Sequence, residues 1–388
     1  MFEIIDKDPS PTVIKVIGVG GAGGNAVEHM IREGVQGVEF ISVNTDGQAL
    51  KNSNSSIKLQ LGPGLGAGGK PGKARELAEA EREQIADALR GANMAFITAG
   101  MGGGTGTGAA PIVAEVAREL GILSVAVVTK PFEFEGMRMR LAEEGIAELS
   151  QHVDSLIVVL NEKLMEVLGE DVGMKDAFRA ADNVLKNAVG GIAEIINVPG
   201  LVNVDFEDVR TVMSEMGKAM MGSSTAAGVD RARIAAEEAV ASPLLEGVEL
   251  SGARGVLVNI TASHSLGMRE VKEAMATIRN YAAEDATVIF GTVFDDAMED
   301  QLRVTVVATG LGGKVAKRPQ LVPKPLETLA IGLRTGTDNG SFDAVGTVDD
   351  SAMPSVFHGR ARNAAVEAMT SSGMDKYDIP AFLRKQAD

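Results

Sequence analysis

The sequence predicts an α/β protein with a parallel sheet, a long central helix and a second α+β domain. Strand-like apolar runs alternate with helical stretches; the runs lie near 13–18, 38–43, 94–99, 123–129 and 154–160, and the helical stretches near 24–33, 72–91, 109–120, 137–151 and 162–169. This alternation is typical of a parallel sheet covered by helices on both faces. A helix over 175–197, apolar around much of its circumference, is expected to be buried between two domains. Strand-like runs near 255–261, 286–291 and 303–308 predict the second domain.

A glycine-rich segment between a predicted strand and a predicted helix is the strongest single signal. Residues 102–108 read Gly-Gly-Gly-Thr-Gly-Thr-Gly, ahead of a helix expected at Ala109 with Pro111 in its first turn. With almost no side chains, the backbone N–H groups can close around an anion at a helix N-terminus. A flexible linker is the alternative, but linkers do not separate a buried strand from an apolar helix. The phosphate-binding candidates are Gly102, Gly103, Gly104, Thr105 and Gly106.

A second glycine-rich segment follows the first predicted strand. Residues 18–23 satisfy the pattern G-x-G-x-x-G, ahead of a helix expected near Gly24. By itself the pattern favours a dinucleotide-binding unit, with Asp46 as the acidic residue after the next strand. Two such segments favour a triphosphate, because one pyrophosphate needs only one helix N-terminus. The candidates here are Gly20, Gly21, Ala22, Gly23, Gly24 and Asn25.

A third glycine-rich segment matches only part of a phosphate-binding motif. Residues 64–70 fit G-x-x-x-x-G-K, but Pro71 follows where the P-loop needs Ser or Thr. Without that hydroxyl the loop offers no Mg²⁺ ligand. We interpret residues 62–73 as a glycine-rich surface loop that could lie over a nucleotide.

Composition excludes several classes of protein. The chain has 388 residues, 45% hydrophobic content, no cysteine, four histidines and a formal net charge of −16. This length is enough for two domains, and the histidines have no metal-ligand spacing, so no metal site made by the protein is expected. The negative charge argues against nucleic-acid binding. No apolar stretch reaches about 18 residues and no basic leader is present, which predicts a cytosolic protein without direct membrane insertion.

The C-terminal quarter has a different character. Residues 313–373 are rich in Gly, Pro, Ser, Thr and Ala with little periodicity, which predicts a flexible tether. In the last segment, 374–388, Ile379, Phe382 and Leu383 fall at i, i+3 and i+4 behind a cap at Asp378. A short apolar stripe on a tether is typical of a peptide that docks into a groove of a partner.

Several motifs together resemble the tubulin/FtsZ GTPase superfamily nearly from end to end. They lie, in order, at 18–21, 43–46, 102–108, 131–136, 203–209 and 378–383. The resemblance implies a GTPase that polymerises head to tail into protofilaments and forms the cytokinetic ring at mid-cell, at the inner face of the membrane. It implies a Rossmann-like GTP-binding domain over 1–173, a central helix and linker over 174–203, and an α+β domain over 204–312. The segments 313–373 and 374–388 would then reach membrane-anchoring and regulatory division proteins.

Recognition of guanine can be argued from two residues of the long helix. Guanine presents N1–H and N2–H₂ as adjacent donors, so a carboxylate such as that of Asp182 can accept both. Phe178, four residues earlier on the same face, could stack on the base. The alternative for Phe178 is a place in the helix core. The resemblance assigns the matching positions to guanine.

The resemblance also assigns Glu135 to the ribose and an arginine to the nucleotide. Arg138 fits the expected spacing best, and Arg140 is an alternative. GTP or GDP is the implied cofactor, with Mg²⁺ held mainly through the phosphates. No residue is expected to form a separate metal site.

Three carboxylates, Asp205, Glu207 and Asp208, open a predicted helix. One interpretation is N-capping, because carboxylates in a first turn stabilise the helix dipole. The resemblance implies that Asp205 and Asp208 polarise water at the GTP of a neighbouring subunit. Two rival functions remain at this point: a dinucleotide-dependent oxidoreductase using the first glycine segment, and a scaffold of the same fold that does not hydrolyse GTP.

Overall fold

One mixed sheet of ten strands forms the centre of the described chain. The computed structural model describes residues 12–169, 173–198, 202, 204–215, 217–241, 253–283 and 285–311. The strand order is β3-β2-β1-β4-β5-β6-β7-β10-β8-β9. The strands are β1 (Ile14–Val19), β2 (Glu39–Asn44), β3 (Ile57–Gln60), β4 (Met94–Gly100), β5 (Leu123–Lys130), β6 (Ser155–Leu160), β7 (Gly217–Ala227), β8 (Gly255–Ala262), β9 (Thr287–Phe294) and β10 (Gln301–Leu311).

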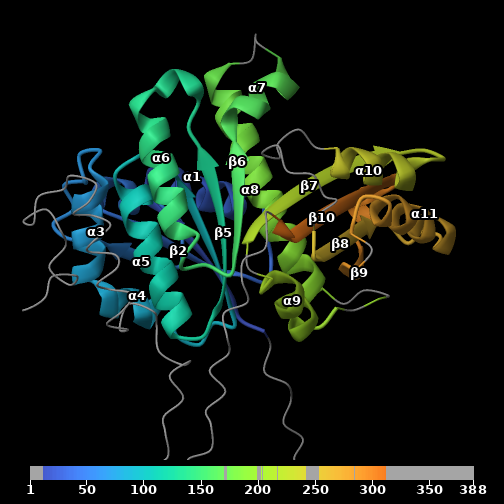
Figure 1. Cartoon of the computed structure of the whole chain (residues 1–388), viewed down its shortest axis with the longest axis horizontal. Coiled ribbons are helices and arrows are strands. Elements are labelled where there is room, and N and C mark those ends of the chain that lie inside the picture. Colours follow the sequence, from blue (N-terminus) through green and yellow to red (C-terminus); the bar gives the residue numbers. More distant parts are fainter. Residues whose placement is uncertain are drawn as a thin grey trace, which may run out of the picture. The chain divides into compact units, whose positions relative to one another are not determined.

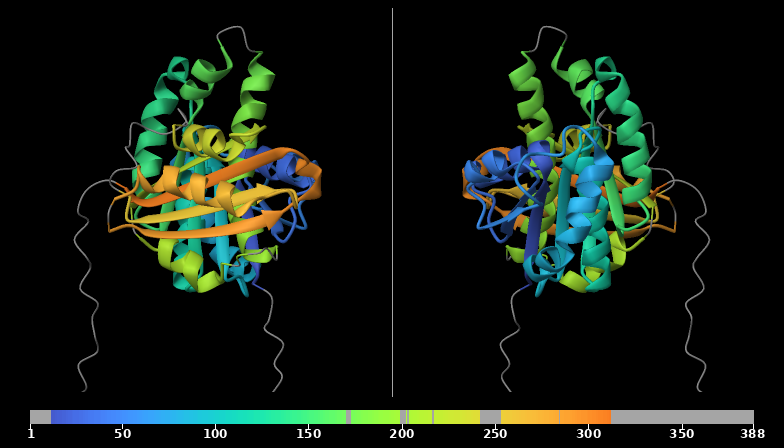
Figure 2. Two further views of the ribbon diagram at one scale, coloured as in Figure 1. Left: turned by 90° about the vertical axis from the view of Figure 1, so that its right-hand side faces the viewer. Right: turned by 90° about the vertical axis from the view of Figure 1, so that its left-hand side faces the viewer.

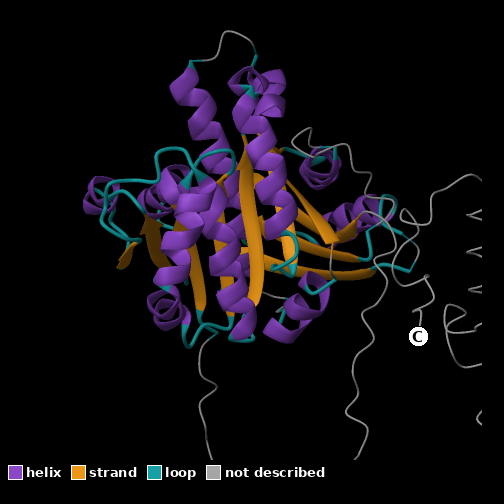
Figure 3. Ribbon diagram, turned by 60° about the vertical axis from the view of Figure 1, so that its left-hand side comes forward, coloured by secondary structure: helices purple, strands orange, loops and turns teal. Residues whose placement is uncertain are grey.

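The first six strands are parallel and carry helices on both faces (Figures 1 and 3). Five of them were predicted, and β3 was not. One face packs against α3 (Pro71–Ala80), α4 (Arg82–Leu89), α5 (Thr105–Glu119) and α6 (Met137–Leu149). The other face packs against α1 (Gly20–Arg32) and the long helix α8 (Met174–Asn197). Two short helices, α2 (Gly47–Lys51) and α7 (Asn161–Leu168), follow β2 and β6. Strands buried on both faces explain the nearly continuous apolar runs of the sequence.

The second half of the sheet is largely antiparallel (Figure 2). β10 lies between β7 and β8 and is antiparallel to both, while β8 and β9 are parallel. Helices α10 (Arg231–Val240) and α11 (Met268–Arg279) cover it with a core of their own. Three residue pairs, from Ser155↔Gly217 to Ile157↔Ala219, join β7 to β6, so the predicted α+β half continues the same sheet.

The long helix α8 matches its predicted bounds within one residue, but it is not buried throughout. Residues 188–193 are fully buried, whereas the first two turns expose Met174, Phe178 and Arg179. The buried part shares one core with β1 and β4 on one side and with Leu257 and Val307 of the second half on the other. The helix therefore lies between the two halves only along its C-terminal part.

Both glycine segments proved to be helix starts rather than loops. α1 begins at Gly20 and not near Gly24, and α5 begins at Thr105 and not at Ala109. The prediction that Pro111 lies in the first turn was wrong, because Pro111 is the seventh residue of α5. Glycine has poor helix propensity, but tertiary packing outweighs it where only a glycine fits.

Some predictions lie outside the described residues. These are the tether 313–373 and the peptide 374–388 with Ile379, Phe382 and Leu383. The domain boundaries also stay predictions. Among the described helices, none is both long and apolar enough to cross a membrane.

Replacing Gly23 by alanine should destabilise the fold. The added methyl group would fall on the backbone carbonyl of Thr98, so α1 must shift from the sheet. We expect a loss of about 1–3 kcal/mol in the free energy of unfolding, measured by urea denaturation followed by circular dichroism.

Gly24→Ala is the matched control. Its methyl group would meet no atom within 4 Å. A better helix former there should leave stability unchanged or raise it by up to about 1 kcal/mol. Equal losses for both variants would contradict the packing argument.

Candidate nucleotide site

A cavity opens where β4, β5 and β6 end and α1 and α5 begin. We call it the phosphate cleft; its volume is about 270 Å³. Its lining comprises Gly21, Ala22, Gly100, Met101, Gly103, Gly104, Thr105, Gly106, Thr129, Pro131, Glu135, Arg138, Asn161 and Phe178. Two helix N-termini meet here, of 13 and 15 residues. Unpaired N–H groups and two aligned dipoles make this a site for an anion.

Contacts between glycines bring the two helix starts together. A Cβ on Gly20 would lie 2.8 Å from the backbone nitrogen of Gly106, and one on Gly106 would lie 2.5 Å from the carbonyl oxygen of Gly100. Gly20 also has φ +78, a backbone conformation that favours glycine. Only glycine therefore permits this approach of α1 to α5.

Two of the predicted glycines support the cleft without lining it. Gly23 packs on Thr98, as described above. Gly102 has φ +92, and its N–H donates to Thr107 Oγ1 at 2.8 Å, which fixes the turn before α5.

A second cavity, the base cleft, adjoins the phosphate cleft and shares Phe178 with it. It is lined by Asn25, His29, Arg32, Lys175, Phe178, Arg179 and Asp182. Phe178 is 45% exposed and meets Phe132 edge-on, with ring centroids 5.7 Å apart. The helix-core alternative for Phe178 is therefore wrong, and its ring is open to a ligand.

Asp182 is partly buried at the base cleft. Burial raises the pKa of its carboxyl to about 6, although nearby His29 and Arg32 offset part of the rise. A ligand that donates hydrogen bonds to a carboxylate in this environment stabilises its charged form. The N1 and N2 groups of guanine are donors of this kind.

Asp46 lines neither cleft. Its carboxylate accepts from the N–H of Gln48 at 2.8 Å and caps α2. A third hollow, between α1 and the end of β2, includes Gly20, Gly24 and Asn25 but not Asp46. The assignment of Asp46 to nucleotide binding therefore stays a prediction, and the structure shows this residue as the cap of α2.

The two candidate arginines differ in position. Arg138 lines the phosphate cleft and pairs with Glu135 at 2.8 Å. Arg140 lines neither cleft and pairs with Glu144 at 3.0 Å. The structure thus places Arg138 beside Glu135 at the cleft, although their contacts with a nucleotide stay a prediction.

Sequence reasoning missed several lining residues. Asn161 is buried, and its Oδ1 has no hydrogen-bond partner among the described residues. Asn161 directly follows β6, at the edge of the sheet where β1 and β4 also end. Its position after a predicted strand could have identified it as a candidate cleft residue. His29 and Arg32 follow Asn25 at helical spacing on α1, which placed them on the same face.

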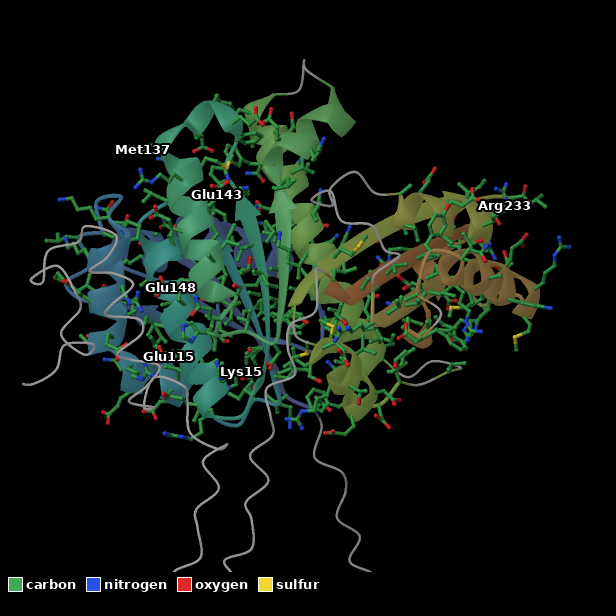
Figure 4. All side chains as sticks on the ribbon, viewed as in Figure 1. Lys15, Glu115, Met137, Glu143, Glu148 and Arg233 are labelled. Atoms are coloured by element: carbon green, nitrogen blue, oxygen red, sulfur yellow. The ribbon has the colours of Figure 1, made fainter. Side chains whose placement is uncertain are left out.

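Helix α9 (Phe206–Met213), whose first turn carries the carboxylates, lies at the end of the parallel strands opposite to the phosphate cleft (Figure 1). Ser155, the first residue of β6, donates its hydroxyl to the Met213 carbonyl at 2.6 Å, so α9 packs where β6 starts. The phosphate cleft lies where β6 ends. Figure 4 labels one residue towards each of these two ends of the sheet. Lys15 lies near the start of β1, and Met137 directly precedes Arg138 in the sequence. The separation is the length of a strand, about 20 Å.

Asp205 and Asp208 are both exposed at the start of α9. Asp205 Oδ1 accepts from the N–H of Asp208 at 2.8 Å, which makes it the N-cap predicted as one alternative. Among the described residues the Asp208 carboxylate has no hydrogen bond or ion pair, whereas Glu207 pairs with Arg210. These groups cannot reach the phosphate cleft of their own chain.

Two protein-family models match this chain, one over each half of the sheet. The model described as Tubulin/FtsZ family, GTPase domain, matches residues 13–169, and the FtsZ family C-terminal domain matches residues 217–312. The cell division protein FtsZ of Pseudomonas putida is 52% identical over 398 residues, covering 100% of each chain. The chain belongs to the FtsZ family.

Further relatives agree. FtsZ of Coxiella burnetii is 52% identical over 395 residues, covering 99% of each chain. A solved structure titled as an empty FtsZ dimer of M. jannaschii is 42% identical, with a TM-score of 0.74 over 78% of this chain and 89% of that one. Membership of the FtsZ family confirms the predicted fold and the GTPase activity, and it does not favour the oxidoreductase alternative.

The guanine affinity of this FtsZ-family protein should depend on pH through Asp182. Its carboxyl, with a pKa of about 6, can accept from N1–H and N2–H₂ with both oxygens only when ionised, because protonation turns one oxygen into a donor. Affinity for GDP should be full above pH 7, fall as the pH drops through 6, and be about tenfold lower at pH 5. Isothermal titration of GDP measures this.

Asp182→Asn is the control for protonation elsewhere in the site and on the phosphates. Its affinity should be lower at pH 7.5, and the ratio of wild type to variant should shrink as the pH falls. A ratio independent of pH would show that the Asp182 carboxylate does not contact the base.

Proposed function

We propose that this GTPase binds GTP across the phosphate and base clefts and hydrolyses it only at contact with a second copy. The start of α1 (Gly20 to Asn25) and the segment that leads into α5 (Gly102 to Gly106) would hold the phosphates. Glu135 and Arg138 would hold the ribose side, and Phe178 with Asp182 would hold guanine. This assignment is supported by two clefts that share Phe178. One lies at two helix N-termini, and the other contains an aromatic ring and a carboxylate.

The position of α9 carries the second part of the proposal. Among the described residues that line the phosphate cleft, the one carboxylate, that of Glu135, is paired with Arg138. Asp205 and Asp208 lie at the far edge of the sheet, so they can act only on the nucleotide of another chain. Stacked head to tail, one copy would present this end to the next copy's cleft. Asp208, and Asp205 beside it, would orient the attacking water.

Mg²⁺ would be held mainly by the phosphates. Among the described residues no group of three or more His, Cys, Asp or Glu side chains could hold a metal ion. The ion would neutralise charge that develops on the phosphate oxygens. The chain's own part is to position the nucleotide and the water.

The cellular role follows from family membership. We infer that the protofilaments form the cytokinetic ring in the cytoplasm, at the inner face of the membrane. Residues 374–388 would bind membrane-anchoring and regulatory division proteins through Ile379, Phe382 and Leu383. Their apolar spacing supports this assignment.

Hydrolysis should require neighbours. Phosphate release per chain should be near zero below a threshold concentration and should rise together with light scattering above it. A specific activity that does not change on dilution would overturn the shared site. Filaments with GTP but without phosphate release would instead indicate a scaffold.

Asp208→Ala should bind GTP and form filaments but lose turnover by at least tenfold, because the water is no longer oriented. If Asp208 acts only on the helix dipole, the melting temperature should fall while turnover per polymer stays constant. Glu207→Ala, which removes the neighbouring carboxylate of the same turn, is the control. Melting curves and phosphate release measured together separate the two cases.

A further inference from the structure

The first turn of α9 concentrates negative charge at the end of the chain that is proposed to meet a second copy. Asp205, Glu207 and Asp208 lie within four residues, and all three are exposed. The helix itself carries one basic residue, Arg210. Since a nucleotide triphosphate is also an anion, each carboxylate of this turn that lacks a partner opposes its approach. Which of the three carboxylates are paired therefore matters for the proposed reaction.

Arg210 pairs with one of these three carboxylates. Its Nη1 lies 3.1 Å from Glu207 Oε1, three residues earlier on the same face of the helix. Asp205 instead accepts from the backbone N–H of Asp208 at 2.8 Å and caps the helix. Asp208, proposed above to orient the attacking water, is then the one carboxylate of this turn that has no hydrogen bond or ion pair among the described residues.

Two further contacts hold the Arg210 side chain in place. Its guanidinium lies over the ring of Phe206, with Cζ 5.6 Å from the ring centroid, and its Nη2 donates to the Gly121 carbonyl at 3.5 Å. Gly121 lies in the turn between α5 and β5, where the N–H of Ile122 donates to the Ala117 carbonyl at 3.0 Å. The guanidinium therefore bridges α9 and the end of α5, and it holds the Glu207 carboxylate against this bridge.

We propose that Arg210 is a positioning residue for hydrolysis, which holds and neutralises Glu207 so that this carboxylate adds no charge beside Asp208. The inference rests on the proposed function. Glu207 and Asp208 are adjacent, so an unpaired Glu207 would bring a further negative charge to the phosphate of the second copy. Like charges that are brought together at an interface are costly. Arg210 acts through Glu207 and does not need to touch the nucleotide.

The test measures GTP turnover per assembled chain, with filaments collected by sedimentation, and the GTP affinity of the unassembled full chain. Arg210→Gln should lower turnover about tenfold and leave affinity within about twofold, because the phosphate cleft lies at the other end of the strands. Arg210→Lys keeps the charge and should stay within about threefold of wild-type turnover. Arg233→Gln is the matched control, because it removes a comparably exposed arginine from a pair with Glu237 on α10, and it should change neither quantity.

Two readouts separate this role from a merely structural one. The double variant Glu207→Ala with Arg210→Gln should recover turnover to within about twofold of wild type, because the unpaired charge is gone. Salt screens repulsion between charges, so the ratio of wild-type to Arg210→Gln turnover should fall from about tenfold at about 0.05 M to about threefold at about 0.5 M. The melting temperature of Arg210→Gln should stay close to that of wild type, because a half-exposed ion pair adds little to stability.

The other outcomes are distinct. Unchanged turnover in Arg210→Gln overturns the proposal, and so does a loss that neither salt nor the second substitution reverses. If Arg210→Gln forms no filaments, their recovery in the double variant supports the proposal and their absence there refutes it. Asp208→Ala, measured in parallel, tests the proposed function separately. Normal turnover of Asp208→Ala would refute that function, whereas a loss there with normal turnover in Arg210→Gln refutes only the role of Arg210.

Discussion

The close approach of α1 to α5 is the constraint on which the rest of the site depends. Gly20 meets Gly106 and Gly106 meets Gly100, with no room for a Cβ at either contact. Any side chain there would separate the two helix starts and divide one strong anion site into two weak ones. Glycine costs helix stability at these positions, up to about 1 kcal/mol each. The β4 and β1 strands, buried on both faces, supply the packing that tolerates this loss.

Helix α8 connects the ends of the molecule that the proposed reaction uses. Its N-terminal part carries the exposed Phe178 and the partly buried Asp182, and its buried C-terminal part shares a core with Val209 and Val212 of α9. The base cleft and the acidic helix start are therefore built on one packed unit. A closely packed core transmits small shifts instead of absorbing them. In the proposed reaction, nucleotide contacts at one end and contacts with a second copy at the other would thus act on the same helix.

The sequence was informative where local pattern and tertiary packing agree. β-branched runs predicted the parallel strands, and the apolar pattern predicted α8 within one residue. Helix starts at Gly20 and Thr105 were missed, because packing there outweighs propensity. β7, rich in Gly, Ala and Ser, has no strand signal of its own and is set by its neighbours β6 and β10. Asn161 lines the cleft because β6 lies in the same sheet as β1 and β4 and ends at the same side. The strand order of the sheet cannot be predicted from the periodicity of the sequence.

The negative net charge of the chain explains why short-range interactions are important for its binding of a nucleotide and of a second copy. At −16 the protein repels both a nucleotide triphosphate and a second copy of itself, although salt screens this beyond about 8–10 Å. Attraction must then arise locally, from helix N-termini and from cations without an internal partner. The acidic start of α9 can approach a second copy favourably only at such a place. The phosphate cleft, where two helix N-termini meet, has that character, so in the proposed assembly the same local field would serve the nucleotide and the neighbouring chain.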